Sequence, residues 1–182
     1  EDLLPFEGID KATVLQECRA FSAVSVDVDQ CLQTMTKLLY LASIGVTFSP
    51  IEATDVFFGA TKLFQCEDPK LRRMLFVLLK ELSSVAEQVF IASSSLVKDI
   101  TGNDDVYRTN ALRTLRKVTD TTMISPMERY LKEAVVDKSS SVVSAAIVTG
   151  IHLSHTQPDM VRRWCTEVSE ALKSRGNKVQ YH

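Results

Sequence analysis

The sequence predicts an all-α protein, an α-solenoid of about nine helices arranged as antiparallel pairs. Two capping signatures predict helix starts, Ser49-Pro50-Ile51-Glu52 and Asp68-Pro69-Lys70-Leu71, because each places a side-chain acceptor before a proline at the first helical position. Glu52 completes a capping box with Ser49. The two starts are 19 residues apart, so one helix must end just before the next begins. Connections this short favour antiparallel neighbours.

Apolar residues recur at helical spacing in the first half of the chain. Asp10 can cap a helix that runs to about residue 20, and Asp29 can cap a second helix whose end is marked by Gly45. Two further helices are expected over residues 50–64 and 69–82. The residues expected to face inward are Val14, Leu15, Cys18, Leu32, Met35, Leu38, Leu39, Leu41, Ala53, Val56, Phe57, Ala60, Phe64, Leu71, Met74, Leu75, Leu78 and Leu82.

Five more helices are expected in the second half. The first, over 89–100, is weaker because it holds three consecutive serines. A helix over 105–118 follows. Ser125 and Glu128 then suggest a capping box that opens a helix to about residue 136, and the alternative is one helix from Thr121 that is kinked at Pro126. The last two helices are expected over 140–153 and 158–173, the final one ended by Gly176.

A loose internal period supports a repeat architecture. Leu71, Tyr107 and Val142 are spaced by 36 and 35 residues, and Leu75, Ala111 and Ala146 keep the same spacings. Helix pairs with a period near this length are typical of HEAT and armadillo repeats, in which neighbours stack because one pair cannot bury its apolar face. A helical bundle without repeats is the alternative.

Composition narrows the class of protein. The 182 residues carry a net charge of -2 and are 45% hydrophobic, which is ordinary for a globular protein and gives no global field that would attract nucleic acid or an anionic membrane. No apolar run approaches the roughly 20 residues that span a bilayer. The four cysteines, Cys18, Cys31, Cys66 and Cys165, form no C-x-x-C pair and sit among apolar neighbours, which predicts buried thiols in a reducing compartment.

Catalytic and metal-binding patterns are weak. The six glycines are too dispersed for a phosphate-binding loop, and no cofactor is expected. His152, His155 and Asp159 could share a zinc ion, but no H-E-x-x-H motif or cysteine pair accompanies them, so histidines at a helix end are the favoured interpretation. Tyr107 and Tyr130 have helical spacing with apolar residues and are expected in the core rather than as acids.

Several blocks resemble the large-chain trunk that clathrin adaptors and the vesicle coatomer share, and within that family they are most similar to the coatomer gamma branch. The blocks are KLLYL at 37–41, EATDVFF at 52–58, TKLFQ at 61–65, DPKLRRM at 68–74, ATVLQE at 12–17, SSLVKD at 94–99, ERYLK at 128–132, VDK at 136–138 and VQYH at 179–182. The similarity covers nearly the whole chain in order. It implies that residues 1–182 form a single N-terminal part of an adaptin-like α-solenoid trunk, truncated at its C-terminal end.

The resemblance also implies a function. It implies a vesicle-coat scaffold without enzymatic activity, in the cytoplasm and on the surface of Golgi membranes, that acts in Golgi-to-ER and intra-Golgi transport. The implied partners are the GTP-bound form of an Arf-family small GTPase, the coatomer zeta subunit and other coatomer subunits. Membrane contact would be indirect, through the coat and the GTPase. A HEAT-type adaptor for another protein partner is the alternative, and a helical enzyme with a hidden site is a third class.

In the family, early even-numbered helices of the trunk form the docking face for the GTPase. The corresponding helices here would be the expected fourth, sixth and eighth. On those helices a continuous outward row would combine basic residues with apolar ones, and an apolar centre within a polar rim is common in protein interfaces. Helical geometry selects Arg73, Val77, Lys80, Arg113, Lys117, Val148 and His152 as the residues expected to face the GTPase.

Overall fold

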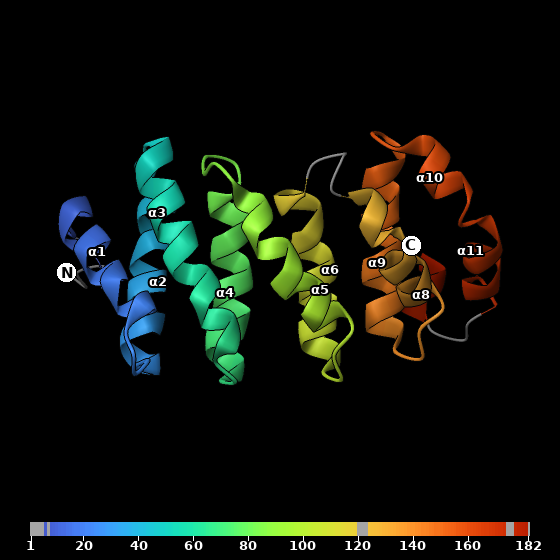
Figure 1. The fold of residues 1–182 in the computed structure, drawn as a ribbon, viewed down its shortest axis with the longest axis horizontal. Coiled ribbons are helices and arrows are strands. Elements are labelled where there is room, and N and C mark those ends of the chain that lie inside the picture. Colours follow the sequence, from blue (N-terminus) through green and yellow to red (C-terminus); the bar gives the residue numbers. More distant parts are fainter. Residues whose placement is uncertain (1–5, 7, 120–123, 174–176, 182) are drawn as a thin grey trace, which may run out of the picture. The chain divides into compact units, whose positions relative to one another are not determined.

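The computed structural model describes residues 6, 8–119, 124–173 and 177–181. Within these residues the chain is helical and contains no strand, which confirms the predicted all-α class (Figure 1). The contacts group the chain into two compact units, residues 1–89 and 90–182. Each unit is a stack of helix pairs.

The N-terminal unit consists of two helix pairs. The first pair is α1 (Lys11–Glu17), which continues as the 3-10 turn η1 (Cys18–Ser22), and α2 (Val28–Ser43). The second is α3 (Pro50–Thr61), extended by η2 (Lys62–Gln65), and α4 (Pro69–Leu82). Helices α3 and α4 are antiparallel, since the Glu87 N–H just after α4 donates to the Thr54 hydroxyl near the start of α3 at 2.8 Å. Helices α2 and α4 pack along each other, and η1 packs on α3.

The C-terminal unit repeats this plan. The turn η3 (Val89–Ala92) leads into α5 (Ser93–Ile100), which pairs with α6 (Asp105–Val118). The turn η4 (Ser125–Met127) leads into α8 (Glu128–Val135), which pairs with α9 (Ser140–Ser154). Helices α10 (Pro158–Arg162) and α12 (Asn177–Tyr181) pack on α9, while α11 (Cys165–Ala171) packs on α8. Helix α6 lies along α9 in the same way that α2 lies along α4.

The internal period of the sequence arises because the repeated residues stand at the same distance from the N-cap in three helices. Asp68, Asp104 and Ser139 are the N-cap residues of α4, α6 and α9, so Leu71, Tyr107 and Val142 each stand three residues after a cap. Leu75, Ala111 and Ala146, seven residues after the caps, are fully buried. Most of the residues expected inward are buried, while Leu15, Leu32, Leu39, Phe64, Met74 and Tyr107 are half-buried.

Several boundaries differ from the sequence-based expectation. Asp27, not Asp29, caps α2, because the Asp27 carboxylate accepts the Gln30 N–H at 3.0 Å and Asp29 stands in the first turn. Ser125 does not form the expected capping box, since η4 has no side-chain cap and Glu128 bonds Arg163 and Trp164 instead. The expected helix over 158–173 is interrupted at Arg163 and Trp164, where the indole is buried. Thr121 and Gly176 lie outside the described residues.

The thiols are less uniform than expected. Cys18 and Cys31 are buried, Cys66 is half-buried and Cys165 is exposed, so the expectation of four buried thiols is wrong for Cys165. Burial raises the pKa of the Cys18 thiol to about 12, and the nearby Glu17 carboxylate adds to this effect. Cys18 is therefore a packed, protonated thiol, which donates to the Val14 carbonyl at 3.2 Å.

Candidate protein-binding surface

The residues expected to face a GTPase lie on α4, α6 and α9. On α4, in the N-terminal unit, Arg73 is exposed, Val77 is 45% exposed and Lys80 is half-buried. Their spacing of four and three residues places them on one side of the helix, while the intervening Leu75, Leu78 and Leu79 are buried. Val77 is thus an exposed apolar side chain that lies between two basic ones along the helix.

The other four expected residues lie on the adjacent helices α6 and α9, and we call these four the α6–α9 surface. Arg113 and Lys117 are exposed on α6, His152 is exposed on α9, and Val148 is half-buried. The two helices run parallel, because one groove is lined by residues at both of their C-terminal ends and another by residues at both of their N-terminal ends. Lys117 and His152 line the C-terminal groove of about 430 Å³ together with Arg116.

The structure therefore brings Lys117 and His152 together, whereas Arg113 lines the N-terminal groove instead. The His152 ring is oriented by its own helix, since Nδ1–H donates to the Val148 carbonyl at 2.8 Å. This leaves the Nε2 edge of the ring available to a partner. The three α4 residues belong to the N-terminal unit.

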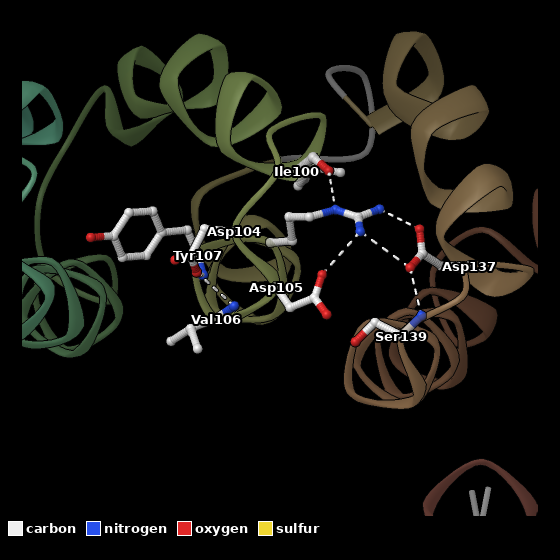
Figure 2. Close-up of polar contacts among 8 residues, drawn as sticks. Ile100, Asp104, Asp105, Val106, Tyr107, Asp137 and Ser139 are labelled. Carbon is white, nitrogen blue, oxygen red and sulfur yellow. Dashed lines mark hydrogen bonds and ion pairs between the residues drawn. The ribbon is translucent and has the colours of Figure 1, made fainter.

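A part-buried ion pair positions the N-terminal ends of α6 and α9. The Arg108 guanidinium on α6 donates to both carboxylate oxygens of Asp137, which lies in the connection from α8 to α9. Its Nε donates to the Ile100 carbonyl at the end of α5 at 3.1 Å, and Nη1 also lies 3.3 Å from the Asp105 carboxylate (Figure 2). Both side chains of the Arg108–Asp137 pair are more than four-fifths buried. One side chain thus ties together α5, α6 and the start of α9.

The same connection is fixed by Asp137 itself. Its Oδ1 accepts the Ser139 N–H at 2.9 Å, so the chain enters α9 in a defined orientation (Figure 2). Burial alone would raise the pKa of this carboxyl, but the hydrogen bonds from Arg108 and the Ser139 N–H, together with the Arg108 charge, hold it below its ordinary value of 3.8. Asp137 is therefore an anion at neutral pH.

Sequence reasoning missed this pair. Neither Arg108 nor Asp137 has a role that the sequence analysis predicts. A signal was present, because Arg72 and Arg108 both stand four residues after an aspartate N-cap, at a position that faces the neighbouring helix. The suggested zinc site finds no support among the described residues, where no group of three or more His, Cys, Asp or Glu side chains could hold a metal ion.

The chain matches the family model described as the adaptin N terminal region over residues 10–182, and it therefore belongs to that family. It is 51% identical to coatomer subunit gamma-2 of Oryza sativa subsp. japonica over 178 residues, which cover 98% of this chain and 20% of the relative. It is 50% identical to coatomer subunit gamma of Arabidopsis thaliana and 46% identical to human coatomer subunit gamma-2 over the same shares. The resemblance seen in the sequence blocks is confirmed.

The chain spans about a fifth of the length of these relatives. No helix in the described ranges is both long enough and apolar enough to cross a bilayer.

Proposed function

We propose that this chain is part of a vesicle-coat subunit without enzymatic activity, a coatomer gamma subunit, that binds the GTP-bound form of an Arf-family GTPase. The observation that carries the proposal is the 46–51% identity to coatomer gamma subunits of plants and animals across 98% of the chain. In this proposal the zeta subunit and other coatomer subunits are further partners, and the coat works in the cytoplasm on Golgi membranes in Golgi-to-ER and intra-Golgi transport.

The proposed contact residues are those of α4 and the α6–α9 surface: Arg73, Val77, Lys80, Arg113, Lys117, Val148 and His152. Their mixture of exposed cationic side chains with Val77 and Val148 supports a protein interface rather than a nucleic-acid groove, which needs a wider basic excess with aromatic residues. Rigid helix rows can distinguish nucleotide states, because switch loops are ordered differently with GTP and GDP. The selectivity then equals the difference in affinity for the two states.

Binding to GTP-locked and GDP-locked forms of an Arf-family GTPase tests the proposal directly. We expect capture by the GTP-locked form alone. Val77→Ala and Arg113→Ala should each weaken that binding by about fivefold or more, with unchanged melting temperature, because both side chains are exposed.

Two matched variants serve as controls. Ile51→Ala removes an even more exposed apolar side chain on α3, and Lys98→Ala removes an exposed charge on α5. Neither should change the affinity. Equal capture by the GTP-locked and GDP-locked forms would reject the proposed partner. State-dependent capture that Val77→Ala and Arg113→Ala leave unchanged would reject the proposed surface. In the former case the alternative of a HEAT-type adaptor for another protein partner would gain support.

A further inference from the structure

The groove between the C-terminal ends of α6 and α9 combines basic side chains with a buried apolar floor. Its volume is about 430 Å³, and Arg116, Lys117 and His152 are the basic residues that line it. Ile124 and Leu153 also line it, and both are more than nine-tenths buried. No aspartate or glutamate in the described part of the chain lines this groove, so its cations face no carboxylate within it.

Arg116 differs from the other half-buried cations of the chain. Four of those cations each form an ion pair with a carboxylate: Lys11, Lys37, Arg108 and Lys132. The Arg116 side chain is half-buried as well, yet its guanidinium has no ion pair or hydrogen bond among the described residues. A partly desolvated guanidinium presents five N–H donors in a fork that fits a carboxylate, so this position favours an anion.

The helix dipoles explain only part of this positive charge. Basic residues in the last turn complement the negative end of a helix, which is equivalent to about half a charge for each of the two helices. The last-turn carbonyls are bonded by other groups, since the Leu115 carbonyl accepts the Thr119 hydroxyl at 2.6 Å and the Leu153 carbonyl accepts the Gln157 N–H at 2.6 Å. The two cations of α6 therefore exceed the dipole charge by about one.

The apolar floor and the position of the groove select the kind of anion. An excess of about one positive charge is balanced by a single carboxylate. The buried Ile124 and Leu153 side chains offer apolar contact to the methylene stem of a glutamate, whereas a phosphate has no such stem. Lys117 and His152 belong both to this groove and to the α6–α9 surface, so a protein docked on that surface also contacts the groove.

We infer that this groove receives a glutamate side chain of the protein that docks on the α6–α9 surface, and that Arg116 is its main anchor. The Arg116 guanidinium and the Lys117 ammonium donate to the carboxylate, while Ile124 and Leu153 pack on the stem. Arg116 is a contact that helical spacing did not select. The identity of the docked protein rests on the proposed function, whereas the chemistry of the groove does not.

A titration of the ¹⁵N-labelled 182-residue chain tests the groove without any partner. The probe is the peptide acetyl-Ala-Glu-Ala-amide, with acetyl-Ala-Gln-Ala-amide as the matched control and inorganic phosphate as a second anion, all at constant ionic strength. We expect saturable shifts of the Arg116, Thr119 and His152 amide resonances with the glutamate peptide, weaker shifts with phosphate and none with the glutamine peptide. Equal shifts from both peptides, or tighter binding of phosphate, would overturn the inference.

Variants assign the donors. Arg116→Gln and Lys117→Gln should each weaken binding of the glutamate peptide by about threefold or more, while Lys98→Gln, which changes an exposed charge on α5, should not. The melting temperature of Arg116→Gln should stay unchanged, because its guanidinium has no partner to lose in the described part of the chain. Undiminished peptide binding by Arg116→Gln, or a lower melting temperature, would contradict the role of Arg116.

Asp120 is the nearest acidic residue to Arg116 in the sequence and lies outside the described residues. Asp120→Asn tests whether the chain supplies the carboxylate to the groove itself. We expect the affinity for the glutamate peptide to stay the same. Peptide binding that becomes tighter by more than about threefold would show that Asp120 competes for the groove, and would overturn the inference.

Capture of the GTP-locked GTPase separates this inference from the proposed function. Arg116→Gln should weaken that capture about as much as it weakens the peptide, and Arg116→Glu should weaken it further because like charges then face each other. Binding of the peptide without capture of the GTPase would support the groove and overturn only the proposed partner. Normal GTPase capture by Arg116→Gln, with peptide binding lost, would overturn the claim that the docked protein places a glutamate there.

A vesicle arm tests a lipid headgroup as the source of the anion. The chain is sedimented with vesicles of phosphatidylcholine alone and with vesicles that also contain phosphatidylserine. We expect no co-sedimentation that depends on Arg116. Binding to the anionic vesicles that Arg116→Gln abolishes would assign the groove to a membrane and overturn the inference.

Discussion

Arg72 and Arg108 show how one side chain can hold a helix pair together. Each stands four residues after an aspartate N-cap, and each donates to a carbonyl eight residues earlier, Phe64 at 2.5 Å and Ile100 at 3.1 Å. The guanidinium thus satisfies the last carbonyls of the preceding helical segment. Arg72 also lies 5.1 Å from the Phe64 ring centroid and 5.5 Å from that of Phe76, which adds cation–π attraction at a buried site.

Asp137→Asn is the sharpest test of the part-buried pair. The substitution keeps the shape and an acceptor for the Ser139 N–H but leaves the Arg108 guanidinium without its main counter-charge. Losing one partner of a fully buried ion pair costs about 3 kcal/mol, and Arg108 and Asp137 are only part-buried, so urea unfolding at about pH 7 should show a smaller loss of about 2 kcal/mol. A loss of unfolding free energy below about 1 kcal/mol would mean that Asp105 and water replace Asp137 as partners of the Arg108 guanidinium.

The same pair predicts a pH dependence. Because the pKa of Asp137 in the folded chain lies below 3.8, its stabilisation is complete above the unfolded-chain value and is lost as the pH falls through the folded value. The difference in unfolding free energy between the natural chain and Asp137→Asn should therefore shrink at about pH 3. A difference that stays constant with pH would show that the carboxylate charge is not what stabilises the pair.

Gly150 and Gly59 give a matched pair of helical glycines. A Cβ at Gly150 would lie 3.0 Å from Cζ3 of the buried Trp164, whereas a Cβ at Gly59 would meet nothing closer than 3.6 Å. Gly150→Ala should cost about 1 kcal/mol net, since overpacking of about 2 kcal/mol exceeds the gain in helix propensity. Gly59→Ala should instead gain up to about 1 kcal/mol. Thermal unfolding would measure both, and shifts of the same sign would contradict the packing argument.

At the scale of elements, capping chemistry explains which helix starts the sequence could reveal. The starts of α3, α4 and α6 follow Ser49, Asp68 and Asp104, and each cap accepts first-turn N–H groups as the residue types predict. The capping-box pattern fails at Ser125. A serine and a glutamate stand at the same spacing there, but the Glu128 carboxylate accepts hydrogen bonds from Arg163 and from the indole N–H of Trp164 instead. Arg163 is 35 residues from Glu128, so a capping rule that considers only four adjacent residues cannot predict this contact.

Ser49→Ala and Ser125→Ala distinguish the two capping boxes. Ser49 accepts the Glu52 N–H at 3.3 Å while the Glu52 carboxylate accepts the Ser49 N–H at 2.8 Å, so its loss should cost about 1 kcal/mol in unfolding free energy. Ser125 forms no side-chain cap, and its substitution should change stability by less than about 0.5 kcal/mol. Equal losses would mean that Ser125 caps the helix in solution.

The candidate surface was predictable as a set of helices but not as a set of contacts. Helical spacing correctly placed Arg73, Arg113 and Lys117 on exposed positions. It could not separate the two grooves between α6 and α9, because the assignment of Arg113 to one and Lys117 to the other depends on how the helices lie together.

At the scale of the whole molecule, the charge balance limits how a partner can be attracted. The chain carries a net charge of -2, yet α6 presents Arg113, Arg116 and Lys117 within its last two turns. A weak overall field gives little long-range steering, while a local cluster acts only within a Debye length, about 8 Å at physiological salt. Charge should thus affect the final approach of a partner rather than its distant encounter.

Association kinetics with the GTP-locked GTPase would test this local role of charge. We expect the association rate to fall by less than about tenfold between about 0.05 and 0.5 M NaCl, and the double substitution Arg113→Gln with Lys117→Gln to remove most of that dependence. Val77→Ala should keep the salt dependence and raise the dissociation rate, because burial of an apolar side chain stabilises the complex after it has formed. Salt dependence that survives the double substitution would place the steering charges elsewhere on the chain. Such a result would leave the effect of Val77→Ala on the dissociation rate as the remaining support for the proposed contact.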